Sequence, residues 1–372
     1  MTPGPTQVRE NVRMARSLVT TNPDLDLEFY DFYKETCDML ASFFDTKNPF
    51  YILSGEGILG LEAACASLTE AKDRVLVIDN GIFGKGFADF VKIYGGEAVL
   101  YSVDELNLVN PSELKKFLEK DHDFKYATLV HCDTPSGMLN DVKTLCCLLQ
   151  SYGILTVVDS VSASFGEPLS MDKAEIDILC GGSQKALSAP VGLTFLGISP
   201  KAIQAMEQRK TPIASFYANI LNYKSYYENK WFPYTMPISD IYGFRAALEN
   251  VVQDEEIFAR HEKIARAVRI AVKKAGLQLH LESGYSNTVT VFNVPDGMKD
   301  TAILEIMKEQ YNIMLAGCFD SLAGKVIRIG HMGENANISD VAETLWALTD
   351  TFRELGHPLA CDMRSVFFQE LS

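Results

Sequence analysis

The sequence lacks the features that usually identify metal-binding, nucleic-acid-binding and membrane proteins. Its eight cysteines form no CxxC pair and its six histidines show no ligand spacing, so no bound metal is expected. Acidic residues outnumber basic ones by 49 to 34, and no basic run occurs, which argues against a nucleic-acid partner. No stretch approaches the roughly 20 consecutive apolar residues of a membrane helix, so no membrane association is expected.

The same absences predict where the protein works. Residues 1–5 do not form a charged segment that leads into an apolar one, so no secretory signal is expected. Scattered cysteines in such a chain are typical of reduced thiols. With 47% hydrophobic and 22% charged residues, the 372 residues are typical of a globular protein with a large core, here expected in the cytoplasm.

Short apolar strands alternate with helical segments through the first two-thirds of the chain. The expected strands are residues 49–54, 74–78, 99–101, 127–132, 155–158, 176–180 and 194–196. The expected helices between them are residues 59–69, 82–94, 111–120 and 142–152. This alternation is typical of an α/β fold, in which helices cover both faces of a mainly parallel sheet.

The pattern changes after residue 241 and predicts a second, α+β domain. One or two long amphipathic helices are expected over residues 241–275, and we expect the two domains to share a long helix. Two strands and two helices follow, over residues 288–292, 301–311, 326–329 and 341–355.

Two charged residues follow neighbouring expected strands. Asp159 ends the strand 155–158, and Lys185 follows a glycine turn, Gly181-Gly182, after the strand 176–180. Side chains at the carboxyl ends of neighbouring strands face one crevice, where α/β sheets bind ligands. A buried lysine with a depressed pKa forms Schiff bases, and an acid nearby can keep a pyridine nitrogen protonated. The pair predicts an enzyme that uses pyridoxal 5′-phosphate (PLP).

A second motif suggests a dinucleotide-binding site instead. Residues 55–60 read GEGILG, a literal GxGxxG between a strand and a helix, and Asp79 follows about 20 residues later, as in a dinucleotide site. However, 50 residues precede this strand, an aromatic follows the acid at Phe83, and the dinucleotide interpretation gives Asp159 and Lys185 no role. A glycine turn at a helix N-terminus also binds the single phosphate of PLP, which we favour.

Several segments, in order along nearly the whole chain, resemble those of class V, fold-type I PLP aminotransferases of the alanine–glyoxylate, serine–glyoxylate and serine–pyruvate type. They are residues 2–6 (TPGPT), 54–57 (SGEG), 80–84 (NGIFG), 131–137 (HCDTPSG), 159–163 (DSVSA), 183–187 (SQKAL), 233–237 (PYTMP) and 328–333 (RIGHMG). The resemblance implies an N-terminal arm of residues 1–15 and a large PLP-binding domain of residues 16–254 with a mostly parallel, seven-stranded sheet. A small α+β domain of residues 255–372 would complete the chain.

The resemblance also implies roles for individual residues around the cofactor ring. Lys185 would carry the Schiff base and move the proton during catalysis, and Asp159 would pair with the pyridine nitrogen. Phe83 would stack on one face of the ring and Val161 would pack on the other. Thr134 would hydrogen-bond near the ring oxygen.

The remaining implied roles concern the phosphate and the substrate. Arg328 would hold the substrate carboxylate with two hydrogen bonds. The phosphate would lie on backbone N–H groups at the glycine turn, with a side chain before the lysine and a threonine from the neighbouring subunit of a homodimer. These phosphate-binding residues are Gly55, Glu56, Gly57, Ile58, Gln184 and Thr235.

Five departures from the family pattern bear on the site, and one of them is Pro135, which replaces a serine. Glu56 stands where serine is usual, and because a carboxylate would repel a phosphate, we expect its side chain to turn away so that only backbone binds. Phe232 stands where some members have a phosphate-binding tyrosine. Residues 21–26 and 316–321, which line the substrate side in relatives, also differ.

The sequence therefore predicts a transaminase that moves an amino group from a small amino acid, of alanine or serine type, to pyruvate or glyoxylate by a ping-pong mechanism. One alternative is 2-aminoethylphosphonate–pyruvate transamination. A less favoured one is a PLP lyase of the cysteine desulfurase type, which would need histidine in place of Phe83 and a reactive loop cysteine, for which only Cys318 is suitably placed.

Overall fold

The computed structural model describes all residues, 1–372, and its centre is a seven-stranded sheet. The strands follow the spatial order β1-β9-β8-β7-β4-β2-β3, and only β9 runs antiparallel to its neighbours. Their bounds are β1 Phe50–Ser54, β2 Arg74–Asp79, β3 Glu97–Ser102, β4 Tyr126–Val130, β7 Leu155–Asp159, β8 Ile178–Gly182 and β9 Leu193–Ile198. The predicted α/β fold with a mostly parallel sheet is confirmed.

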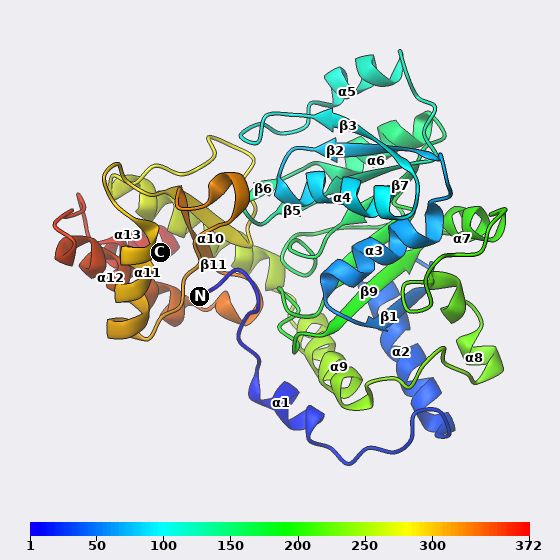
Figure 1. The fold of residues 1–372 in the computed structure, drawn as a ribbon. Coiled ribbons are helices and arrows are strands. Elements are labelled where there is room, and N and C mark those ends of the chain that lie inside the picture. Colours follow the sequence, from blue (N-terminus) through cyan, green and yellow to red (C-terminus); the bar gives the residue numbers. More distant parts are fainter.

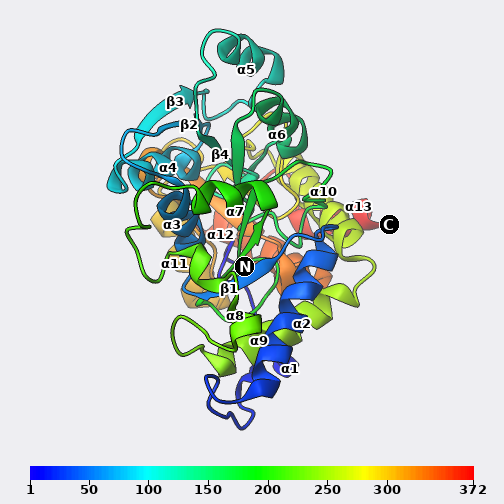
Figure 2. The same ribbon diagram turned by 90° about the vertical axis from the view of Figure 1, so that its right-hand side faces the viewer.

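Helices cover both faces of this sheet. On one face, α3 (Gly57–Leu68) and α4 (Ile82–Ile93) lie side by side, as Figure 1 shows. On the other face, α6 (Val142–Ser151) packs against β4 and β7, and Figure 2 shows the sheet between the two layers. The strands β7, β8 and β9 are buried almost throughout, as strands covered on both faces must be.

The strand order excludes the dinucleotide interpretation of the GxGxxG motif. In a dinucleotide-binding unit the strand before the glycine turn and the strand after the following helix are parallel neighbours. Here the strand before the turn, β1, is an edge strand paired only with the antiparallel β9. The next strand, β2, lies near the opposite edge, between β3 and β4.

Six of the seven expected strands end one or two residues away from the predicted position, and two of these differences have a visible cause. β8 was expected over residues 176–180 but begins and ends two residues later, so Gly181 and Gly182 belong to the strand rather than to a turn. The ring of Phe195 on β9 lies over Gly181, where a Cβ atom would come within 1.9 Å of Cζ. β4 ends at Val130, two residues early, because the next residues turn into a short hairpin of β5 (Cys132–Asp133) and β6 (Met138–Leu139).

The last third of the chain forms a smaller α+β unit, as predicted. Its antiparallel strands are β10 (Val289–Asn293) and β11 (Val326–Gly330). Its helices are α10 (Ile257–Lys274), α11 (Asp300–Tyr311), α12 (Ile338–Glu354) and α13 (Met363–Leu371). They surround a separate core of 24 buried apolar residues, whereas a core of 75 residues fills the large sheet domain.

The segment 241–275, expected to form one or two long helices, forms two, so the two units do not share a single long helix. α9 (Ile238–Val252) ends four residues before α10 begins, at the acidic stretch 253–256. Asp254 accepts the N–H of Glu256 and pairs with Arg260, so the polar stretch starts a new helix instead of continuing the old one. The predicted domain boundary at residues 254 and 255 falls in this break and stays a prediction.

Several helices were not predicted. They are α1 (Glu10–Arg16), α2 (Leu27–Phe43), α7 (Pro200–Glu207), α8 (Tyr226–Asn229) and α13, whereas α5 (Pro111–Leu118) begins after Asn110 as expected. The longest, α2, begins at a readable signal, because the Asp26 side chain accepts the N–H of Glu28. It packs against the edge strand β1, where the Tyr33 hydroxyl bonds the backbone of Ile52.

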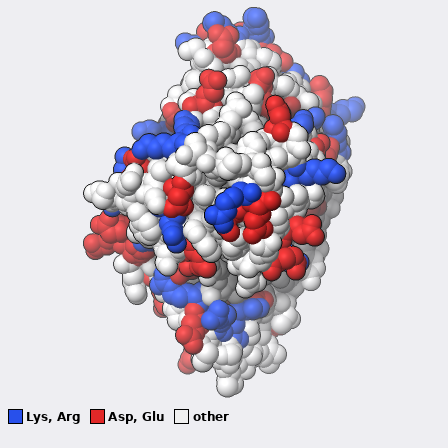
Figure 3. Space-filling model, turned by 90° about the vertical axis from the view of Figure 1, so that its left-hand side faces the viewer, with Lys and Arg blue, Asp and Glu red and all other residues white.

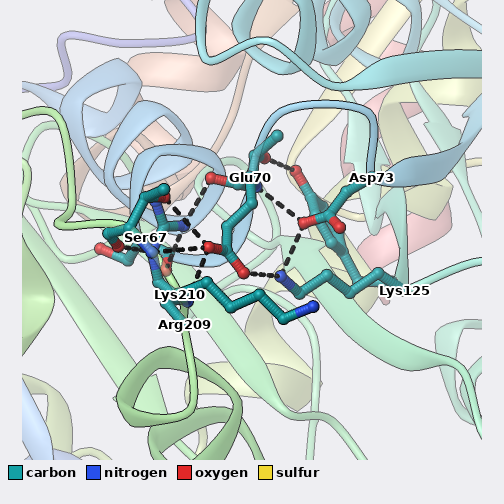
Figure 4. A network of polar contacts seen from close by, with 9 residues as sticks. Ser67, Glu70, Asp73, Lys125, Arg209 and Lys210 are labelled. Carbon is teal, nitrogen blue, oxygen red and sulfur yellow. Dashed lines mark hydrogen bonds and ion pairs between the residues drawn. The ribbon is translucent and has the colours of Figure 1, made fainter.

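A polar network fixes the far end of α3, whose N-terminus carries the glycine turn (Figure 4). The Glu70 carboxylate accepts the backbone N–H groups of Lys210 and Thr211, and the Lys125 amine lies 2.6 Å from an Asp73 oxygen. Arg209 donates to the carbonyls of Ser67 and Thr69. The loop after α7 is thereby fastened to the turn that connects α3 with β2.

Three further features of the structure concern the surface charges, the cysteines and the helices. On the face shown in Figure 3, acidic and basic side chains are interspersed, with no continuous basic patch. All eight cysteines are free. None of the helices combines the length and apolar character that crossing a membrane requires.

A buried histidine in α10 generates a pH-dependent prediction for stability. His261 Nε2 accepts the N–H of Gly333, Nδ1 bonds the Ile257 carbonyl, and burial lowers the His261 pKa from 6.5 to about 4. Because the unfolded chain binds this proton more readily, the His261 contribution is complete above pH 6.5 and is lost as the pH falls towards 4. We expect His261→Gln to lower the free energy of unfolding by about 1–3 kcal/mol at pH 7.5, and by progressively less below pH 6.5.

Urea unfolding at several pH values measures this difference. The exposed His357→Gln serves as the control, for which we expect little change at any pH. A wild-type advantage over His261→Gln that is the same at pH 7.5 and pH 4.5 would contradict the assignment.

Candidate active site

The parallel pair β7 and β8 brings the two predicted residues to one cavity. Asp159 is the last residue of β7 and pairs in register with Cys180, and Lys185 follows β8 by three residues. Both side chains line a cavity of about 310 Å³ at the carboxyl ends of these strands. The juxtaposition expected from the sequence is therefore present.

Asp159 is a buried carboxylate with few partners. The N–H of Val161 donates to Oδ1 at 2.9 Å, and no cation lies within ion-pair distance. Burial raises the Asp159 pKa to about 7, while the Val161 N–H and the charge of Lys185 act in the opposite direction. A cationic group beside Asp159 would favour its ionised form.

Lys185 is enclosed by the N-terminal arm. Its amine donates to the Pro3 carbonyl at 2.7 Å. Burial lowers the Lys185 pKa, and the positive charge of Arg328 lowers it further. A larger share of the amine is therefore neutral at a given pH than in water, and the neutral form is the nucleophile and the base.

The arm reaches Lys185 because of a glycine. Gly4 has a φ of +96°, and a Cβ atom there would lie 2.5 Å from Lys185 Cδ and 2.8 Å from Nζ. Thr6 fixes the next residues by donating its N–H to the Gln184 carbonyl and its hydroxyl to the Lys185 carbonyl. In Figure 1 the arm lies between the two domains. It therefore forms one wall of the site.

The cavity contains most of the predicted cofactor-binding residues. They are Glu56, Gly57, Ile58, Phe83, Thr134, Asp159, Val161, Gln184 and Lys185. Gly57 admits Val161 closely, because a Cβ atom on Gly57 would lie 3.0 Å from both Val161 methyl carbons. Gly55 does not line the cavity and instead donates its N–H to the Gly192 carbonyl at 2.8 Å.

A buried acid that was not predicted holds the ring-stacking candidate. Asp133 accepts the N–H of Phe83 at 3.3 Å and the hydroxyl of Ser136 at 2.7 Å. Burial raises the Asp133 pKa. Gly81 makes room for this carboxylate, because a Cβ atom there would lie 2.5 Å from Asp133 Cγ. Asp133 thus helps to position the start of α4, where Phe83 lies.

The expectation for Glu56 is wrong. Its carboxylate does not turn away but caps α3, where Oε2 accepts the Ile58 N–H at 3.0 Å and Oε1 accepts the Gln184 side-chain amide. Unpaired N–H groups at a helix N-terminus attract any anion, and the Glu56 carboxylate is the nearest anion in the chain. Glu56 therefore binds two of the donors that were predicted for the phosphate.

The two ends of the cavity consequently differ in their fit to PLP. The acid Asp159 and the amine Lys185 suit a pyridine ring that carries an aldehyde. At the other end, the Glu56 carboxylate occupies the helix N-terminus, and no lysine or arginine other than Lys185 lines the cavity. The residues fit the ring of PLP, but they do not fit its phosphate.

Arg328 lies in an adjoining cavity that shares Phe83, Thr134 and Lys185 with the first. It projects from β11, and its Nε donates to the Gly317 carbonyl at 2.7 Å. No carboxylate lies within ion-pair distance of its guanidinium, and burial lowers its pKa. Within this chain the guanidinium is not neutralised, so it can bind an anionic group.

Other predicted positions lie outside these cavities. Thr235 is exposed and donates its hydroxyl to Asp24 Oδ2 at 2.9 Å. Phe232 is buried and stacks on Tyr30 with ring centres 4.6 Å apart, so it is a core residue. Of the loop 316–321, Ala316 and Phe319 line the cavity of Arg328.

Some cavity residues were missed by reasoning from the sequence. They are Gly4, Pro5, Leu61, Cys132, Ser162 and Val191. For the arm the TPGPT motif was the available signal, since a glycine between prolines indicates a special backbone geometry. No local pattern identified the others, because their contribution depends on the packing of distant segments.

The chain resembles known aminotransferases over most of its length. Residues 8–324 match the family Aminotransferase class-V. An uncharacterized aminotransferase of Methanocaldococcus jannaschii is 35% identical over 96% of this chain and 93% of its own. The pyridoxamine–pyruvate transaminase of Mesorhizobium japonicum is 31% identical over 91% and 87%. The crystal structure of ureidoglycine–glyoxylate aminotransferase from Bacillus subtilis superposes with a TM-score of 0.96 at 26% identity, covering 100% of this chain and 97% of that one.

Proposed function

From the premise that this chain belongs to the class V aminotransferases, we propose that it moves an amino group from a small amino acid, of alanine or serine type, to pyruvate or glyoxylate. As a member of that family it is a PLP-dependent transaminase. The observation that supports a catalytic role most directly is the position of Asp159 and Lys185 at the ends of two adjacent parallel strands in one cavity.

The roles of the ring-binding residues follow from their surroundings. When PLP is bound, its ring supplies an electron sink for the reaction. Asp159, buried and accepting only one N–H, would hold a proton on the ring nitrogen. Phe83 and Val161 would enclose the ring, and Thr134 would hydrogen-bond near its oxygen. The Lys185 amine, once free of the Pro3 carbonyl, would take and return the proton that moves during the transfer.

Arg328 supports the choice of an amino acid and a 2-oxo acid as substrates. Both carry a carboxylate, and a guanidinium binds a carboxylate with two parallel hydrogen bonds. Arg328 Nε is already committed to the Gly317 carbonyl, which orients the two terminal nitrogens. One arginine used in turn by donor and acceptor agrees with a ping-pong mechanism. Two of the relatives, the pyridoxamine–pyruvate transaminase and the ureidoglycine–glyoxylate aminotransferase, carry pyruvate or glyoxylate in their names.

The lyase alternative receives less support from the surroundings of Cys318. The chain has Phe83, rather than a histidine, at the position expected to stack on the ring. Burial raises the Cys318 pKa, although Arg328 acts in the opposite direction, so its thiol is held more in the unreactive protonated form. The proposed function is therefore transamination.

The first test is the absorption spectrum of the protein with PLP and a panel of amino donors. We expect a visible band from bound PLP that one small amino acid removes and a 2-oxo acid restores. Lys185→Ala should lower turnover by roughly 10²- to 10⁴-fold, because it removes the proton-transferring group. The exposed Lys92→Ala is the matched control. A Lys185→Ala protein with normal turnover would refute the proposal.

A second test concerns the substrate carboxylate. Arg328→Lys keeps the charge but loses the paired hydrogen bonds, so we expect KM for donor and acceptor to rise by roughly 10- to 100-fold. Cofactor binding should change little, because Arg328 does not line the ring cavity. Steady-state kinetics measure KM, with the exposed Arg266→Lys as control. An unchanged KM would remove Arg328 from the substrate site.

We also propose a homodimer with a shared site. Thr235 is exposed and lies outside the cavity of its own chain, so it could act on the cofactor only in a neighbouring subunit. We expect sedimentation to show a dimer and specific activity to fall when dilution separates the subunits. A fully active monomer would contradict this arrangement.

A further inference from the structure

Glu56 occupies the helix N-terminus that the sequence predicted as the phosphate site. It is the N-cap residue of α3, a helix of 12 residues, and it accepts the Ile58 N–H and the Gln184 amide. Glutamate is not among the residues preferred at this position, where a shorter polar side chain is usual. The longer side chain lets the carboxylate reach Gln184, which lies 128 residues away in the sequence.

The charges of the cavity disfavour a second anion at this end. Two carboxylates, Glu56 and Asp159, line the cavity together with one amine, Lys185. That amine bonds the Pro3 carbonyl and is required at the ring. A phosphate monoester carries about −1.5 to −2 charges at neutral pH. Its binding would bring like charges together and would take the helix N–H group that Glu56 now uses.

Gln184 provides independent evidence against a phosphate at this end of the cavity. Its side chain is 4% exposed and lines the cavity, and its Oε1 is a buried acceptor without any hydrogen-bond partner. Its amide nitrogen already donates to Glu56, so the amide orientation is fixed by that contact. Such an oxygen needs a donor. A hydroxyl group can donate to it, whereas a phosphate dianion offers only acceptors.

We propose that this site binds the phosphate-free vitamers pyridoxal and pyridoxamine in preference to their phosphates, with the hydroxymethyl group at the Glu56 and Gln184 end of the cavity. The inference rests on the proposed function, because it assumes that Lys185 and Asp159 bind the pyridine ring. The ring chemistry of a PLP enzyme is retained, whereas the anchoring of the opposite end changes.

Loss of the phosphate anchor changes the role of the bound vitamer. A vitamer that is not held by its phosphate exchanges with solution, so pyridoxamine serves as an amino donor and pyridoxal leaves as product. In the balanced reaction, pyridoxamine and a 2-oxo acid give pyridoxal and an amino acid. The amino group and one hydrogen move from C4′ of the vitamer to C2 of the acid. The carbonyl oxygen of the acid leaves as water, and another water supplies the aldehyde oxygen of pyridoxal.

Titration of the apoprotein with pyridoxal and with PLP tests the preference by the visible band of the lysine-bound vitamer. We expect wild type to bind pyridoxal at least tenfold more tightly than PLP. Glu56→Ser, which provides the residue usual in the family, should bind PLP more tightly than pyridoxal. Glu56→Gln keeps a capping oxygen but removes the charge, and it should shift the ratio of the two affinities at least tenfold towards PLP.

Controls separate this inference from the proposed function. Glu113→Gln removes an exposed acid from the first turn of α5 and should leave the ratio unchanged. Wild type that binds PLP more tightly than pyridoxal would overturn the inference, as would a ratio that neither Glu56 variant changes. Absence of a Lys185-dependent band with either vitamer would refute the proposed function instead. With pyridoxamine and pyruvate, pyridoxal should accumulate beyond the amount of enzyme.

Discussion

The burial of Asp159 is the constraint on which the site depends. A carboxylate at the end of a central strand, with one N–H as partner, is costly to ionise, and its pKa of about 7 reflects that cost. A positively charged ring nitrogen would lower the cost because it provides the missing counter-charge. The surrounding elements serve this arrangement: β7 and β8 are parallel, so the lysine segment leaves the sheet beside the acid, and the arm closes the cavity over both.

The opposite end of the cavity differs in its charges from the end at Asp159. There the helix N-terminus, which attracts anions, is already satisfied by Glu56 of the chain itself. The buried acid therefore needs a cation at one end, while a built-in anion excludes further negative charge at the other. The two ends together describe a ligand that is cationic at the ring and carries little negative charge opposite to it.

The chain shows which parts of such a site can be predicted from sequence. The proximity of Asp159 and Lys185 was predictable, because apolar runs identify buried strands and parallel strands end at one edge of a sheet. The start of α5 was readable from Asn110, whose side chain caps the helix as expected. The extent of β8 was not predictable, since Gly181 pairs with Phe195 of β9, whose ring fills the space of a side chain at that position. The orientation of Glu56 depends on Gln184, which no local pattern relates to it.

The N-terminal arm imposes an order on the assembly of the molecule. The Met1 carbonyl bonds the N–H of Gly330, the Thr2 carbonyl accepts the Asn335 amide, and Pro3 meets Lys185. These partners lie 182 to 333 residues further along the chain, so the arm reaches its final position only after they have been synthesised. Closing so long a loop carries an entropic cost that local contacts do not. The wall of the cavity beside Lys185 is thus among the last parts to form, and a growing chain carries its reactive amine uncovered until the small domain has folded.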